Sequence, residues 1–198
     1  MMKPVSGPED DIEKRRGHLR QQALEARQAL SAAHREDLER QLVFHLDGVI
    51  GGLAPRTLGF CWPYRAEPDL RAWVQAWLGE DETRVAALPV VVEKRAAMHF
   101  RRWTPGAEMV PDRYGIPHPV EPLEVRPEVV LIPLNAFDAA GYRLGYGGGY
   151  FDRTLAQMDT IAIGVGFELG RVPSALPQAH DRPMDWIVTE AGAARAVR

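Results

Sequence analysis

The segment best suited to chemistry is a glycine-rich run at residues 143–153, which reads RLGYGGGYFDR. Four of its residues lack a Cβ: Gly145, Gly147, Gly148 and Gly149. Such residues let backbone N–H groups converge on an anion, and the start of a following helix also favours negative charge. Arg143 and Arg153 bracket the run and can donate charge-assisted hydrogen bonds to phosphate oxygens. The pattern therefore indicates a phosphate-binding loop.

A simple tight turn is the alternative interpretation of this loop. The chain has no GxxxxGK[ST] pattern, and Tyr150 stands where GxGxxG requires its third glycine. Glycines can also serve only to close a strand-to-helix connection. However, Tyr146, Tyr150 and two arginines lie among these glycines, and a turn alone needs none of them. The ligand loop is therefore favoured over the turn.

Two helices are expected to precede the sheet that carries this loop. Residues 12–30 have apolar residues at helical spacing. Four arginines are expected on the more solvated sides of this helix: Arg15, Arg16, Arg20 and Arg27. Ser31 can cap a second helix, which should end before Gly51 and Gly52. Residues 1–10 are expected to form a disordered leader, and residues 11–198 a single domain.

Further along the chain, strand-like runs alternate with helical ones. Strands are expected at residues 57–62, 85–92, 98–103, 129–134, 161–167 and 186–189. One helix should have Pro68 in its first turn and end near Gly79, and another should cover 152–158. The run VVLIPL at 129–134 is apolar throughout, which is typical of a strand covered on both faces. We therefore predict a three-layer α/β/α domain with a mostly parallel sheet.

The composition excludes several other classes of protein. The 198 residues include 24 Lys and Arg against 27 Asp and Glu, so nucleic acid is not an expected partner. The only cysteine, Cys61, allows neither an intramolecular disulfide nor a CxxC metal site, which favours a reducing compartment. No apolar run approaches the ~18 residues of a membrane span, and residues 1–20 lack the apolar core of a signal peptide. We expect a cytoplasmic protein with no membrane partner, and a monomer is favoured.

Several motifs together carry a family resemblance. They are RxxLR at 16–20, FCWPYRAEPDL at 60–70, LPVV at 88–91, GIPHP at 115–119, the glycine loop, and HDRPMDWIVTE at 180–190. Their order and spacing over most of the chain resemble those of 5-formyltetrahydrofolate cyclo-ligases, also called methenyltetrahydrofolate synthetases. The resemblance implies a fold similar to that of ribose-5-phosphate isomerase and the CoA transferases.

The resemblance also implies a reaction and its small-molecule substrate. In this family 5-formyltetrahydrofolate becomes 5,10-methenyltetrahydrofolate at the expense of ATP, with Mg²⁺, and ADP and phosphate are released. The formyl oxygen is phosphorylated, N10 attacks the activated carbon, and phosphate leaves. Because an amide-like oxygen is a poor leaving group, the enzyme has mainly to align the reactants and neutralise charge. Two alternatives are a non-catalytic folate- or nucleotide-binding paralogue and a sugar-phosphate isomerase on the same fold.

By motif, the resemblance assigns residues to each site. The ATP site would comprise Arg16, Arg20, Arg143, Leu144, Gly145, Tyr146, Gly147, Gly148, Gly149, Tyr150 and Phe151. The folate site would comprise Trp62, Glu67, Tyr146, Gly147, Gly148, Gly149 and Tyr150. The implied catalytic residues are Arg143 and Tyr150. The implied magnesium ligands are Asp152 and Asp181, which fits the preference of Mg²⁺ for one or two carboxylates with phosphate oxygens.

Structural roles compete with these assignments. Arg16 stands where the family usually has Lys, so a planar guanidinium with several donors replaces a compact ammonium charge. Arg16 and Arg20 could also simply face solvent on the surface of a helix. Trp62 could belong to the core, and Glu67 could be a charge at a helix N-terminus. The two loop tyrosines could pack the loop down, and Asp152 could cap the helix that follows it.

Overall fold

The structure, a computed structural model, describes residues 8–197, and side chains from residue 11 onward. The helices are α1 Pro8–Gln28, α2 Ala32–Leu53, α3 Arg71–Gly79 and α4 Tyr150–Leu155, with a 3₁₀ turn η1 at Glu168–Gly170. The strands are β1 Thr57–Gly59, β2 Val85–Val90, β3 His99–Trp103, β4 Met109–Pro111, β5 Pro117–Pro119, β6 Val129–Pro133, β7 Ala136–Phe137, β8 Arg143–Leu144, β9 Ile161–Val165, β10 Trp186–Thr189 and β11 Gly192–Arg195. Thus α1 begins before the expected residue 12 and includes residues 8–10 of the predicted leader, while residues 1–7 lie outside the described part of the chain.

Seven strands form the central sheet, in the order β11-β10-β9-β6-β1-β2-β3. The five inner strands are parallel, and only β11 and β3 pair antiparallel to their neighbours. The fully apolar run predicted as a covered strand is β6, which lies in the middle of the sheet with Val130 and Ile132 completely buried. A central strand has two covered faces, so it needs apolar side chains on both. The mostly parallel sheet is therefore confirmed.

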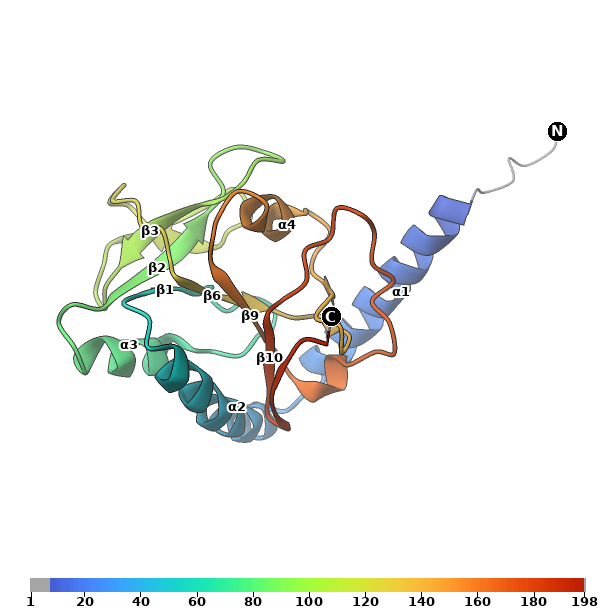
Figure 1. The fold of residues 1–198 in the computed structure, drawn as a ribbon, viewed down its shortest axis with the longest axis horizontal. Helices are drawn as coiled ribbons and strands as arrows, with labels where there is room; N and C mark the ends of the chain where they lie inside the picture. The colour runs from blue at the N-terminus through green and yellow to red at the C-terminus, as the bar shows by residue number, and fades with distance from the viewer. Residues whose placement is uncertain (1–7, 198) are drawn as a thin grey trace.

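Helices cover both faces of this sheet (Figure 1). On one face α2 and α3 contribute Leu42, Leu46 and Val74 to the larger apolar core. On the other face α4 packs Phe151 and Leu155, and the loop after it packs Met158, against a second core. The three-layer α/β/α prediction is confirmed, although the second helical layer contains only the six-residue α4.

The long α2 confirms one predicted boundary and corrects another. Ser31 caps it, since its Oγ accepts the N–H of His34 at 3.2 Å. The helix does not stop before Gly51 and Gly52 but runs to Leu53, and Ala54 closes it in a left-handed conformation. Val49 and Ile50 are buried against the core, and this packing outweighs the low helix propensity of two glycines. The next helix, α3, also differs from expectation, because Pro68 precedes it instead of lying in its first turn.

Helix α1 does not lie on the sheet. It packs against the β7–β8 hairpin and η1, and its N-terminal part extends away from the domain (Figure 1). Two of its arginines are deeply buried, Arg16 at 7% and Arg27 at 2% exposure, so the expectation that they face solvent is wrong. The surface beneath α1 offers carboxylate and carbonyl oxygens to these side chains, which explains why charged groups can be buried there. No described helix is long and apolar enough to cross a membrane.

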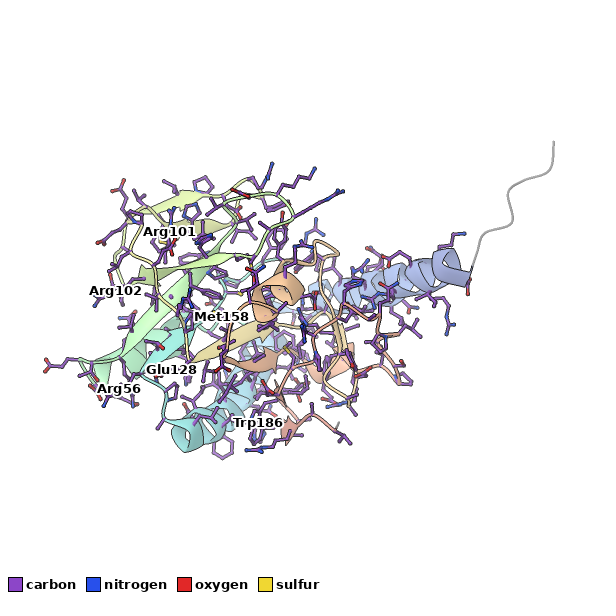
Figure 2. The ribbon with its side chains drawn as sticks, turned by 45° about the horizontal axis from the view of Figure 1, so that its top comes forward. Arg56, Arg101, Arg102, Glu128, Met158 and Trp186 are labelled. Carbon is purple, nitrogen blue, oxygen red and sulfur yellow. The ribbon has the colours of Figure 1, made fainter. Side chains whose placement is uncertain are left out.

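The two ends of the parallel strands serve different purposes. At the amino ends, Glu128 accepts the N–H groups of Arg56 and Thr57, which ties the start of β1 to the start of β6 (Figure 2). At the opposite ends, the loops that follow β1, β6 and β9 contain most of the residues assigned to sites. Open α/β sheets bind ligands at the carboxyl ends of their parallel strands. This end of the sheet is therefore the place to look for an active site.

Candidate active site

The glycine loop connects β8 directly to α4. Gly147 and Gly149 have left-handed φ angles of +87° and +63°, which glycine adopts without strain. Gly149 occupies the N-cap of α4, and no side chain caps this helix. Asp152 lies in the first turn of α4, so its possible role as the N-cap is wrong. Residues 146–148 are thus an exposed, sharply turned segment, and the side chains of Arg20 and Tyr150 lie beside its glycines.

Arg20 of α1 lies over this loop. A Cβ built on Gly147 would lie 3.7 Å from the Arg20 Cζ atom, in van der Waals contact, so the guanidinium lies directly beside this glycine. The Nε of Arg20 is buried and has no hydrogen-bond partner within residues 8–197. Its nearest carboxylate, Glu13, is 3.8 Å from Nη2. A buried donor without a partner beside an exposed glycine loop is suited to receive an anion.

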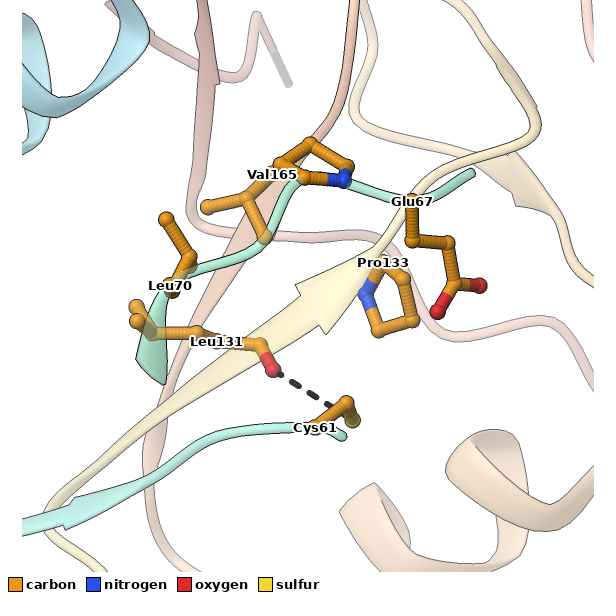
Figure 3. A pocket seen from close by; sticks show the side chains of 7 residues that line it. Cys61, Glu67, Leu70, Leu131, Pro133 and Val165 are labelled. Atoms are coloured by element: carbon orange, nitrogen blue, oxygen red, sulfur yellow. Dashed lines mark hydrogen bonds between the residues drawn. The ribbon is translucent and has the colours of Figure 1, made fainter. Parts of the chain in front are cut away.

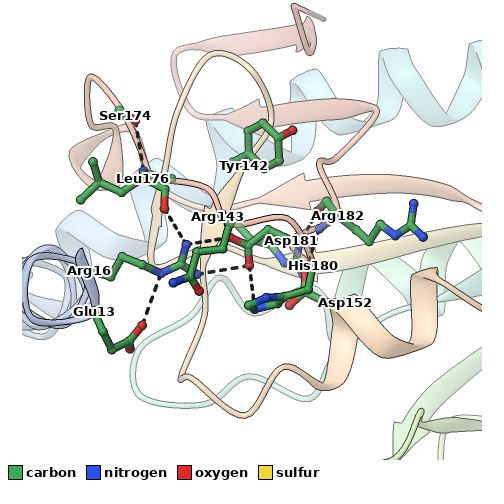
Figure 4. Close-up of polar contacts among 12 residues, drawn as sticks. Glu13, Arg16, Tyr142, Arg143, Asp152, Ser174, Leu176, His180, Asp181 and Arg182 are labelled. Atoms are coloured by element: carbon green, nitrogen blue, oxygen red, sulfur yellow. Dashed lines mark hydrogen bonds and ion pairs between the residues drawn. The ribbon is translucent and has the colours of Figure 1, made fainter. Parts of the chain in front are cut away.

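Arg16, one turn earlier, is already paired (Figure 4). Its Nη1 donates to Oδ2 of Asp181 at 2.6 Å and to the carbonyl of Leu176 at 2.8 Å, and its Nη2 donates to Oδ1 of Asp181 at 3.2 Å. Oδ2 of Asp181 also accepts the N–H of Gln178. Burial raises the pKa of Asp181, but the hydrogen bonds and charge of Arg16 outweigh burial and leave this pKa lowered. Both assigned residues are therefore engaged with each other here.

Arg143 and Asp152 form a second buried pair. Arg143 donates to the carbonyl of Arg182 at 2.8 Å and to Oδ1 of Asp152 at 3.2 Å. Burial lowers the pKa of Arg143, and the neighbouring Asp152 opposes that shift. Oδ1 of Asp152 also accepts the N–H of Arg182, whereas Oδ2 makes no hydrogen bond within the described chain. This free oxygen gives Asp152 the capacity to hold a cation. Among described residues, no three His, Cys, Asp or Glu side chains group to hold a metal.

Tyr150 is joined to a separate hairpin. Its hydroxyl lies 2.7 Å from the hydroxyl of Tyr114, which stands between β4 and β5. Arg153 stacks near the Tyr150 ring, but its guanidinium donates to the carbonyls of Gly148 and Ala96. The expected phosphate contact of Arg153 is therefore replaced by bonds to protein carbonyls. Sequence reasoning did not single out Tyr114, although it immediately precedes the quoted GIPHP motif.

Glu67 lies at the centre of the other half of the site. It is 5% exposed, and its oxygens accept the N–H of Tyr64 at 3.0 Å and the hydroxyl of Tyr146 at 2.8 Å. Burial raises its pKa, and the charge of Arg27 together with these hydrogen bonds opposes that shift. Burial also raises the pKa of Tyr146, so this phenol stays protonated as a donor. The structure thus links Glu67, the carboxylate predicted to bind folate, to Tyr146 of the glycine loop.

The other assigned residues mainly support these groups. Trp62 is partly buried against the larger core, and the Arg71 guanidinium stacks on its ring at 4.6 Å. Leu144 is buried in a small cluster beneath the loop, and Phe151 packs under α4. Glu67 also lines a small cavity with Cys61, Pro68, Leu70, Leu131, Pro133 and Val165 (Figure 3). The cavity holds about 10 Å³ of solvent space, roughly that of one water molecule, so it cannot enclose a pterin ring.

Arg27 is a residue of the site that sequence reasoning missed, because it was expected on a solvated side of α1. Its guanidinium contacts the loop after β1, the end of β6 and the glycine loop. A signal was available, because Arg27 follows Ala23 by four residues and Leu24 by three, and both of these are buried. Residues at these spacings share a helix face, so the periodicity indicated a buried position.

Comparisons with known proteins point to one family. The model of the 5-formyltetrahydrofolate cyclo-ligase family matches residues 12–190. The 5-formyltetrahydrofolate cyclo-ligase of Mycolicibacterium smegmatis is 30% identical over 188 residues, which cover 88% of this chain and 93% of that protein. The corresponding protein of Haemophilus influenzae is 27% identical over 177 residues, 84% of this chain and 92% of the relative.

A solved structure shows that the fold is also similar to that of a related enzyme. The 5,10-methenyltetrahydrofolate synthetase of Aquifex aeolicus superposes with a TM-score of 0.80 at 27% identity, covering 92% of this chain and 93% of that one. The family match therefore extends from residue 12, within α1, to the residue after β10. It takes in the glycine loop, Glu67 and the Arg16–Asp181 and Arg143–Asp152 pairs. On this evidence the chain belongs to the 5-formyltetrahydrofolate cyclo-ligase family.

Proposed function

We propose that this chain uses ATP to convert 5-formyltetrahydrofolate into 5,10-methenyltetrahydrofolate, with Mg²⁺ at the phosphates. Family membership supports the reaction class. The observation that carries the proposal is that one loop lies between two complementary groups. Arg20, whose buried Nε has no described partner, lies against Gly147, while Tyr146 of the same loop bonds the buried Glu67.

At the nucleotide end, this chain would supply backbone N–H groups and cationic side chains. Phosphate oxygens would approach the backbone at the exposed Gly147, and Arg20 beside it would donate to them. Bound Mg²⁺ would neutralise phosphate charge, and the free Oδ2 of Asp152 is suited to hold it. Arg143 is enclosed by its bonds to Asp152 and Arg182, so its contacts support a role in positioning Asp152.

At the folate end, Glu67 would accept hydrogen bonds from the pterin. Each carboxylate oxygen can accept more than one hydrogen bond, so those from Tyr64 and Tyr146 leave capacity for a ligand. Tyr150 would lie between the two substrates, and its hydroxyl bond to Tyr114 would hold its ring in place. Trp62 stays a predicted stacking partner, with its ring shared between the core and Arg71.

The chemistry would proceed in two displacements. The formyl oxygen would attack the γ-phosphorus, the bond from that phosphorus to the bridging oxygen would break, and ADP would leave with its electron pair. N10 would then attack the activated carbon and lose its proton, and the carbon–oxygen bond would break to release phosphate. Neither step requires a covalent bond to the protein, so its contribution is alignment and charge neutralisation.

One assay tests the proposal. Purified protein is mixed with 5-formyltetrahydrofolate, and absorbance of the methenyl product is followed with and without ATP and with excess chelator. Product should form only when ATP and Mg²⁺ are both present, because uncompensated phosphate charge blocks transfer. Full activity under chelation would contradict the magnesium requirement. Tight folate binding without product would favour the non-catalytic paralogue instead, and turnover of a sugar phosphate would favour the isomerase.

Location and assembly are also proposed. Cys61, the free thiol of the described chain, supports a reducing compartment, and we propose the cytoplasm. The small folate and nucleotide are the proposed partners, without nucleic acid or membrane. We propose a monomer, which light scattering of the purified protein would test by giving a mass near 22.1 kDa.

A further inference from the structure

One guanidinium connects three loops of the site. Arg27 donates from Nε to the carbonyl of Arg65 at 3.1 Å, and from Nη1 to the carbonyl of Leu134 at 3.1 Å and to Oδ1 of Asn135 at 2.8 Å. Its Nη2 donates to the hydroxyl of Tyr146 at 2.8 Å. With 2% exposure, this side chain is held on every side by acceptors from distant parts of the chain.

The hydrogen bonds through Tyr146 have a defined direction. A guanidinium has only donors, so the Tyr146 oxygen must accept from Arg27. The single phenolic proton is then left for Oε1 of Glu67, at 2.8 Å. The order is therefore Arg27 to Tyr146 to Glu67, and the Tyr146 oxygen cannot move far without losing both partners.

Tyr146 also belongs to the glycine loop. It immediately precedes Gly147, whose left-handed backbone faces Arg20. The residue is 44% exposed, and its ring packs edge-on against that of Tyr64 with 5.5 Å between the ring centroids, while its hydroxyl bonds the buried Arg27 and Glu67. Tyr64 in turn donates its N–H to Glu67. Tyr146 thus joins the glycine loop to both groups that bond the Glu67 carboxylate, its own hydroxyl and the Tyr64 N–H.

We propose that Arg27 is a positioning residue which, through the Tyr146 hydroxyl, couples nucleotide binding at the glycine loop to folate binding at Glu67. This inference rests on the proposed function, because it assumes that the loop takes ATP and that Glu67 takes folate. Phosphate bound at the loop would restrain Tyr146 in the place it already holds between Arg27 and Glu67, so that the Glu67 carboxylate stays preorganised for the pterin. By thermodynamic reciprocity, folate strengthens nucleotide binding by the same factor.

Calorimetric titration measures this coupling directly. The wild-type protein is titrated with 5-formyltetrahydrofolate, alone and with the β,γ-imido analogue of ATP plus Mg²⁺, which cannot transfer its phosphoryl group. The Kd for folate should fall at least fivefold in the presence of the analogue, within the usual range of coupling of about 5–150-fold. In Tyr146→Phe, which removes one oxygen and keeps the ring, the ratio of the two Kd values should fall below about twofold.

Arg27→Lys should lose the coupling as well, because lysine keeps the charge but cannot reach all four acceptors. The variant with both substitutions should lose no more of the coupling than either single variant, as expected for two residues that act through the same hydrogen bonds. Tyr142→Phe is the matched control, since its hydroxyl makes no hydrogen bond to a described residue and the variant should keep the wild-type ratio. If Arg27→Lys folds poorly, Tyr146→Phe decides alone.

Two results would overturn the inference without touching the proposed function. One is a wild-type protein that forms the methenyl product but binds folate equally well with and without the analogue. The other is a Tyr146→Phe variant whose ratio equals that of the wild type. A wild-type protein that forms no product with ATP and Mg²⁺ would instead refute the proposed function itself.

Discussion

Arg16 and Asp181 neutralise each other across 165 positions of the chain, with both carboxylate oxygens accepting from one guanidinium. Their side chains are 8% and 7% exposed, so solvent screens the pair only weakly. By motif, Arg16 is predicted to bind phosphate and Asp181 to bind Mg²⁺. If both predictions hold, ligand binding would replace one internal ion pair with two contacts to the magnesium nucleotide.

Removal of this carboxylate should destabilise the folded protein. In Asp181→Asn the buried guanidinium loses its counter-charge, and the free energy of unfolding should fall by about 2–4 kcal/mol. Urea denaturation at pH 7 measures the loss. Asp37→Asn is the control, because the Asp37–Arg40 pair is largely exposed and should contribute less than about 1 kcal/mol. Equal losses of unfolding free energy in the two variants would show that the buried pair stabilises the protein no more than the exposed pair does.

The same pair predicts a pH dependence with a definite sign. The pKa of Asp181 is lowered below its ordinary value near 3.8 by Arg16 and the Gln178 N–H, despite burial. A carboxyl with a lowered folded-state pKa stabilises the protein above its unfolded pKa, and this stabilisation is lost as the pH falls through the folded value. The stability difference between wild type and Asp181→Asn should therefore be constant from pH 7 to pH 5 and shrink below pH ~4. A difference that grows on acidification would contradict the assignment.

Replacement of Glu67 should affect folate more than ATP. Glu67→Gln removes the charged acceptor, so the KM for 5-formyltetrahydrofolate should rise about 10–100-fold while that for ATP changes less than about threefold. Burial raises the pKa of Glu67 above 4.5, so in the wild type the folate KM should rise as the pH falls towards that range. The glutamine variant should lack this rise. Initial rates at several pH values test both statements, and equal changes in the two KM values would count against a pterin contact.

Gly148 is constrained by contact and not by its backbone angle. Its φ is not left-handed, but a Cβ there would lie 2.7 Å from the Tyr150 ring, which is held by Tyr114 and Arg153. Gly148→Ala should therefore displace Tyr150 and lower kcat/KM for ATP about tenfold or more. The melting temperature should change by only a few degrees, because the loop is exposed. A variant with normal kcat/KM and a much lower melting temperature would show that the glycine serves only the turn.

The glycines inside α2 should behave in the opposite way. Gly51 and Gly52 lie in the helix and are exposed, and a Cβ added at either residue would meet nothing within 4 Å. Alanine at either position should raise the free energy of unfolding by about 0.5–1 kcal/mol, because alanine loses less backbone entropy on folding. Thermal and urea unfolding measure the gain, and turnover should stay at the wild-type level. A loss of stability would show that the end of α2 is strained.

Local patterns in the sequence determined much of the fold. The apolar run of β6 required a strand covered on both faces, and the hydroxyl of Ser31 marked the start of α2. Glycine spacing located the exposed loop before α4. These features depend on side-chain chemistry over a few neighbouring residues, so a short window of sequence contains the information that defines them.

Only the tertiary structure decided which partners the charged side chains bind. The periodicity of α1 could not show that its arginines face oxygen atoms, because the partners Leu134 and Asp181 lie more than 100 positions away. The sequence suggested Arg153 as a phosphate ligand, but in the folded chain its Nε donates to the carbonyl of Ala96, 57 positions away. The energy of a charged group is set by whatever surrounds it at a few ångströms, and distant segments supply those surroundings only after the chain has folded.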